Sequence, residues 1–136
     1  MIQLVREDLV ILLEGGYIYL RMGLFDEARE VFEGVCLLAP ESEIPLVAIG
    51  SIFFAQKKFD QALRVYKKAL ALKPDSAFAR AYMGESLFFK GLREEALTEF
   101  EKASLLDPSG KSGEFARTFL EAIKKGFEPP APIVHH

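Results

Sequence analysis

Small and large apolar residues recur along this chain with a fixed period of 34 positions. A period of this size indicates stacked supersecondary units, none of which can bury its apolar face alone. In each period we expect two antiparallel helices joined by a short turn, so the predicted fold is all-α. The repeating positions are Gly16, Gly50 and Gly84, then Ala28, Ala62 and Ala96, then Phe32, Tyr66 and Phe100, and lastly Pro40, Pro74 and Pro108.

The residue types at these positions have a physical reason. Glycine on the first helix and alanine on the second carry little side chain, so the two backbones can approach closely where they cross. The aromatic residue lies four positions beyond each alanine, on the same helix face. Proline ends the second helix because it lacks a backbone donor and its ring clashes within a continuing helix. A further set, expected in the wedge between the two helices, is Tyr19, Phe53 and Leu87.

The spacing Gly-x2-aromatic or Leu, then Ala-x3-Phe or Tyr, then Pro resembles the tetratricopeptide repeat over residues 9–110. The resemblance implies three tandem helix-turn-helix repeats in a right-handed superhelix, within a single domain of residues 1–126. The predicted repeats are 9–42, 43–76 and 77–110.

A seventh helix is predicted over residues 113–126, outside the repeats. Phe115, Phe119 and Ile123 recur every four residues, which gives the helix one apolar face. We expect it to cap the open end of the third repeat. Residues 127–136 form a proline-rich tail, expected to be extended and either inert or laid against another surface. Its last two residues, His135 and His136, resemble an affinity tag.

Composition excludes several function classes. The net charge is −3 with 27% charged residues, and no basic stripe appears, which argues against nucleic-acid binding. The apolar run from Leu9 to Leu13 is too short to cross a bilayer, so we expect no membrane insertion and a cytoplasmic location. Without a histidine outside the tail, and with Cys36 as the single cysteine, no catalytic or metal-ligand set can be assembled. We therefore expect no enzyme activity, no metal and no cofactor.

The repeat resemblance implies that the first helix of each pair lines a concave groove that binds a protein partner. A carboxylate clamp of Lys and Asn is excluded, because apolar residues hold the corresponding positions. The expected ligand is an amphipathic helix or an extended segment with large apolar residues. The alternative is that some of these residues pack within the array. The predicted groove residues are Leu13, Tyr17, Leu20, Val47, Ser51, Phe54, Ala81, Glu85 and Phe88.

The segment from Phe25 to Phe32, followed by Val35–Leu38 and Pro40, resembles the first repeat of the small chaperones of bacterial type III secretion, of the translocator or needle-subunit class. This resemblance implies a chaperone that keeps an apolar segment of an export substrate buried in its groove. The alternative is a general tetratricopeptide adaptor or scaffold subunit of a multiprotein assembly.

The N-terminal stretch of residues 2–13 carries more apolar residues than one helix face can bury. Four consecutive apolar residues from Val10 to Leu13 point in four directions on a helix. We expect this stretch to pair with a second copy or with a co-chaperone, or to fold over its own groove. The residues expected at the contact are Ile2, Val5, Leu9, Ile11 and Leu12.

Overall fold

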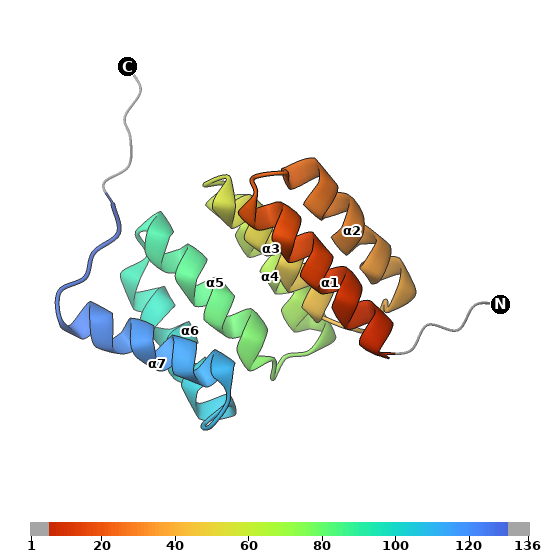
Figure 1. Ribbon diagram of the computed structural model, residues 1–136. Helices are drawn as coiled ribbons and strands as arrows, with labels where there is room; N and C mark the ends of the chain where they lie inside the picture. The colour runs from red at the N-terminus through yellow and green to blue at the C-terminus, as the bar shows by residue number, and fades with distance from the viewer. Residues whose placement is uncertain (1–5, 131–136) are drawn as a thin grey trace, which may run out of the picture. The chain divides into compact units, whose positions relative to one another are not determined.

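The computed structural model describes residues 6–130, and this range contains seven α-helices and no strand (Figure 1). The predicted all-α fold is confirmed. Ile2, Val5 and the terminal histidines lie outside the described residues. The helices are α1 (Arg6–Arg21), α2 (Phe25–Leu38), α3 (Ile44–Ala55), α4 (Phe59–Leu72), α5 (Ala77–Lys90), α6 (Arg93–Leu106) and α7 (Lys111–Lys124).

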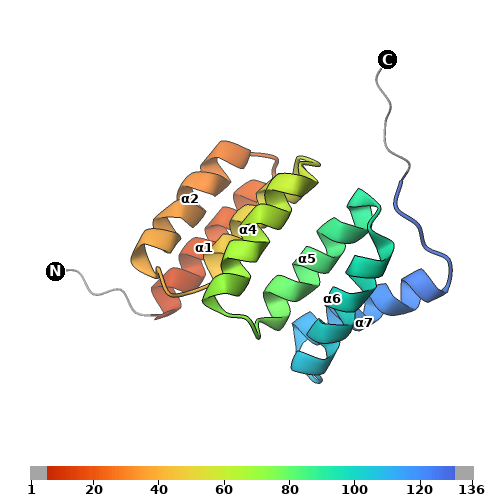
Figure 2. The same ribbon diagram turned by 180° about the vertical axis from the view of Figure 1, so that it is seen from behind.

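The chain forms two compact units, one up to Pro74 and one from Asp75 onward. In the first unit α1 pairs with α2 and α3 pairs with α4, while α3 also packs against α2 and α1. In the second unit α5, α6 and α7 pack against one another. Figures 1 and 2 show these helix pairs from two sides. The pairs α3/α4 and α5/α6 fall within the second and third predicted repeats, and α1/α2 falls within the first except that α1 begins at Arg6, three residues before the predicted start at 9.

In every pair the glycine of the first helix faces the aromatic ring of the second. A Cβ added at Gly16 would overlap the ring of Phe32, and one added at Gly50 would overlap the ring of Tyr66. The third pair repeats this arrangement, with the Phe100 ring 2.8 Å from a Cβ built at residue 84. The absent side chain therefore makes room for a fully buried ring as well as for a close backbone approach.

The turn inside each pair uses one left-handed residue at a position that also repeats every 34 residues. Gly23, Lys57 and Gly91 have φ values of 76°, 62° and 98°. The next amide N–H donates to a carbonyl five residues earlier, as in the bond from Leu24 to Tyr19 of 2.9 Å. This is the Schellman arrangement, which prefers glycine. Lys57 adopts the same conformation with a side chain.

Helix α7 begins at Lys111, two residues before the predicted start at 113, and ends at Lys124. The correction has a local cause. The Asp107 carboxylate accepts a hydrogen bond of 3.1 Å from the amide N–H of Gly113, which satisfies a donor in the first turn and lets the helix start earlier. At the other end Gly126 is left-handed, as expected of the predicted C-terminal stop, and the Phe127 N–H donates to the Ala122 carbonyl.

Candidate partner-binding surfaces

One side of the first unit carries half-buried apolar residues of α1. Leu13, Tyr17 and Leu20 pack against a buried cluster of α2 and α3 residues and keep part of their surface exposed. The Tyr17 ring lies 5.1 Å from the buried ring of Phe32, measured between centroids. The core thus holds these side chains in place and leaves one edge of each available for contact.

Helix α3 contributes only a few exposed residues to this side. The helix contains no charged residue, and neighbouring helices bury it from more than one direction. Val47, predicted to line the groove, is fully buried. Ser51 is half-exposed, and its hydroxyl donates to the Val47 carbonyl at 3.1 Å. Phe54 is also half-buried, with its ring 5.6 Å from that of Phe59. We call Leu13, Tyr17, Leu20, Ser51 and Phe54 the α1/α3 surface.

In the second unit two predicted groove residues are core residues. Ala81 is fully buried and Phe88 is 2% exposed, so neither forms an open wall. The cause is a cluster of rings around Phe88. Phe127 stacks on it with centroids 5.6 Å apart, and Phe119 of α7 meets it edge-on at 6.0 Å. The sequence could not show this, because Phe127 lies in the segment predicted to be an extended tail.

Glu85 is the predicted groove residue of α5 that keeps partial exposure. Burial raises the pKa of its carboxyl from 4.5 to about 7. One turn away, the Tyr82 ring stacks on Phe115 of α7 at 5.0 Å, and burial together with the Glu85 charge raises the pKa of its phenol. With a pKa of about 7 this carboxyl is neutral in a large share of molecules near pH 7, so it suits contact with apolar groups better than an ordinary glutamate would.

The opposite side of α1 is apolar and open. Ile11 is 64% exposed and Leu12 is exposed, whereas Leu9 is half-buried. Tyr19 was expected in the wedge between the helices, yet it is 38% exposed. Its counterpart Phe53 lies under the guanidinium of Arg29, which belongs to the preceding helix pair. Tyr19 has no such cover in the described chain, which explains the difference.

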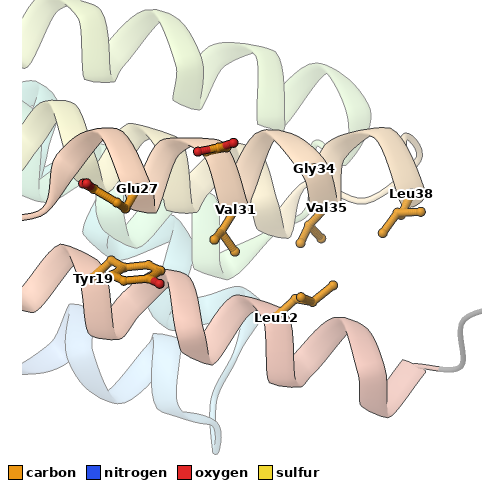
Figure 3. Close-up of a pocket in the computed structure, with 8 residues that line it drawn as sticks. Leu12, Tyr19, Glu27, Val31, Gly34, Val35 and Leu38 are labelled. Carbon is orange, nitrogen blue, oxygen red and sulfur yellow. The ribbon is translucent and has the colours of Figure 1, made fainter.

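A cavity of about 380 Å³ opens between α1 and α2 on this side (Figure 3). Leu12 and Tyr19 come to it from α1, and Val31 and Leu38 from α2. The repeat period could have predicted this cavity. Tyr19 is the first-repeat equivalent of Phe53, and the first repeat has no preceding helix pair among the described residues to cover that position. Its lining consists of Leu12, Tyr19, Glu27, Glu30, Val31, Gly34, Val35 and Leu38.

The described residues contain no group of three or more His, Cys, Asp and Glu that could hold a metal ion. Burial, and then the charge of Glu33, raise the pKa of the Cys36 thiol. That thiol is therefore less reactive than an ordinary one. Between residues 6 and 130, no helix has both the length and the apolar content needed to span a membrane.

The comparisons with known proteins agree with this architecture. A family described as "Tetratricopeptide repeat" matches residues 13–42, and one described as "TPR repeat" matches residues 50–91. The two matches together cover more than half of the chain, which is therefore a tetratricopeptide-repeat protein. No curated protein sequence matches it.

Solved structures with the same fold include type III secretion chaperones. The translocator chaperone SycD of Yersinia enterocolitica aligns with a TM-score of 0.73 and 20% identity, over 87% of this chain and 91% of SycD. PcrH of Pseudomonas aeruginosa, solved with the chaperone binding region of PopD, aligns with a TM-score of 0.69 and 20% identity, over 92% of this chain and 98% of PcrH. The first TPR domain of Spaghetti (RPAP3), bound to an HSP90 peptide, aligns with a TM-score of 0.67 and 24% identity, over 91% of this chain and 99% of that domain. At these identities the likeness is one of fold.

Proposed function

We propose that this protein is a cytoplasmic chaperone that holds an apolar or amphipathic segment of a partner protein, and that the partner is an export substrate of a type III secretion system. The observation that carries the proposal is the α1/α3 surface, where Tyr17 and Leu20 pack against the core, Phe54 packs against Phe59, and all three stay partly exposed. Burying one large apolar side chain of a ligand contributes about 1.5–3 kcal/mol. A few such anchors give useful affinity.

Local charge supports an apolar ligand over an acidic peptide end. Positions that hold a peptide carboxylate in clamp-type tetratricopeptide domains are occupied here by Leu13, Tyr17, Val47 and Ala81, none of which is a charged donor. Glu85 would add a carboxyl where such a ligand needs a cation. The HSP90 peptide bound by Spaghetti, which ends in Glu-Val-Asp, is therefore a poor ligand for this chain.

The proposal of a chaperone is supported by the similar solved structures as well as by the α1/α3 surface. SycD and PcrH are translocator chaperones, and both have been solved with segments of translocators. A general adaptor of the same fold would bind a folded partner, for which the sequence offers no specific feature. We infer a role in binding and protection of an unfolded apolar segment, with no catalytic step.

The proposal is tested by titrating the protein with two labelled peptides, the chaperone binding region of PopD and the HSP90 peptide SRMEEVD. We expect micromolar binding of the PopD region, and weaker binding of a variant whose large apolar residues are replaced by serine. SRMEEVD should show no saturable binding. If SRMEEVD binds more tightly than the PopD region, the chain belongs with the clamp-type adaptors and the proposal is wrong.

A further inference from the structure

The first repeat exposes a helix face that the second repeat buries. Ile11, Ile18 and Met22 of α1 are 64%, 50% and 66% exposed. Thirty-four residues later, the equivalent of Ile18 is Ile52, which is 3% exposed and belongs to the core cluster with α1 and α2 residues. The equivalent of Ile11 is Pro45, which is also buried. Helix α1 therefore carries apolar residues at positions that the internal helix α3 buries, and nothing described covers them.

This face and the adjoining cavity form one surface, which we call the outer α1/α2 face. It is separate from the α1/α3 surface, because the two lie on different sides of α1. Figure 3 shows Leu12 and Tyr19 on α1 across the opening from Val31 and Val35 on α2. A cavity of about 380 Å³ has room for large side chains presented by a helix.

The edge of the outer α1/α2 face is acidic. Helices α1 and α2 together carry seven acidic and three basic residues, whereas α3 and α4 carry one acidic and three basic. Glu27 and Glu30 line the cavity, and Glu14 is exposed between Ile11 and Ile18. Within residues 6–130 these three carboxylates make no ion pair or hydrogen bond. A second copy would bring the same acidic edge against itself, which is unfavourable. A basic partner is complementary.

Elsewhere in this chain, an amphipathic helix covers the exposed apolar face of a helix pair. In the second unit α7 covers α5 and α6 with an apolar stripe that includes Phe115, Phe119 and Ile123, and it keeps its charged residues outside. We propose that the outer α1/α2 face docks an amphipathic helix of a different polypeptide, whose apolar stripe is bordered by Lys or Arg. This site is additional to the proposed substrate surface and does not depend on it.

The experiment uses two synthetic helical peptides with the same apolar stripe at i, i+3, i+4 and i+7, one bordered by Lys and the other by Glu. Binding to the full chain is followed by fluorescence anisotropy at low and high salt. We expect the Lys peptide to bind roughly tenfold or more tightly than the Glu peptide, with a preference that shrinks as salt rises. The double variant E27Q/E30Q should reduce that preference.

Two further variants locate the site. Ile18→Asp should weaken the binding of the Lys peptide roughly tenfold or more. Phe54→Glu, on the α1/α3 surface, should leave the affinity for this peptide unchanged. Because Ile18 is half-exposed, circular dichroism should show unchanged helicity, and Ile18→Ser serves as a milder check. Equal binding of the two peptides would overturn the proposal. So would loss of binding in Phe54→Glu alone, or a dimer in sedimentation that Ile18→Asp converts to a monomer, since the occupant would then be a second copy.

Discussion

The ring of Phe32 occupies the space that a side chain on Gly16 would need. At Gly15, one position earlier on the same helix, an added Cβ would meet no atom within 4 Å beyond the neighbouring residues and backbone of its own helix. Two adjacent glycines of α1 thus have opposite roles. One is required by packing, and the other only lowers the stability of the helix, because glycine loses more backbone entropy on folding than alanine does.

The Gly16→Ala substitution should therefore destabilise the first unit. The added methyl group displaces the buried ring at a cost of about 1–3 kcal/mol, which the higher helix propensity of alanine offsets by about 1 kcal/mol. Gly15→Ala should stabilise it by up to about 1 kcal/mol. Urea unfolding of both variants measures the difference, and shifts of the same sign in both would contradict the assigned packing.

Lys57 holds a left-handed conformation that glycine holds at the two equivalent positions. Such a conformation costs an L-residue with a side chain about 1–2 kcal/mol, while glycine adds entropy to the unfolded chain. Lys57→Gly should therefore raise the free energy of unfolding by about 0.5–1 kcal/mol. Gly23→Ala, at the equivalent turn of the first pair, should lower it by about 1 kcal/mol. Thermal unfolding tests both, and a lower Tm for Lys57→Gly would show that the turn is not strained.

An ion pair in the second unit occupies two positions that hold apolar residues in the preceding repeat. Arg80 Nη1 lies 2.9 Å from Glu99 Oε2, and the residues 34 positions earlier are Leu46 and Val65. The pair is largely buried, with side-chain exposures of 18% for Arg80 and 11% for Glu99, so losing its charge-assisted hydrogen bond in Glu99→Val should lower the free energy of unfolding by about 1.5–3 kcal/mol. The double variant R80L/E99V, which copies the second repeat, should recover most of that loss. A double variant as unstable as the sum of the single ones would refute this interpretation.

The period of 34 residues was enough to predict the helix pairs, because glycine, alanine and the aromatic residue each meet a local packing requirement that every repeat shares. It was not enough for Tyr19. That residue has the same type and position as Phe53, but its exposure depends on whether a preceding helix covers it. Repeat phase determines which way a side chain points, whereas burial also depends on the neighbours of the repeat.

Phe88 illustrates the same limit at the other end of the chain. Its phase places it among groove residues, yet Phe127 and Phe119 bury it. The start of α7 was likewise decided by Asp107, a residue outside the predicted helix. The five residues of the α1/α3 surface remain a prediction from phase, supported by their partial exposure.

Glu85 should make stability depend on pH in a defined direction. Burial raises the pKa of its carboxyl from 4.5 in the unfolded chain to about 7 in the folded one. Between these values the folded state binds more protons, so this group lowers stability as pH rises through the window. The penalty is absent below about pH 4.5 and complete above about pH 7. Glu85→Gln should therefore raise the Tm more at pH 8 than at pH 5. An equal shift at both pH values would contradict the raised pKa.

The central claim is that the α1/α3 surface holds an apolar segment, and the most direct test is the Kd of the labelled PopD region for two surface variants. Ser51→Glu places a charge within the surface, and Phe54→Glu also removes an apolar anchor. Losing one anchor of about 1.5–3 kcal/mol corresponds to a roughly ten- to hundredfold weaker Kd. We expect losses of this size in both variants, with unchanged helicity, and no loss in Lys68→Glu on the exposed side of α4. Unchanged Kd values in both surface variants would contradict the account.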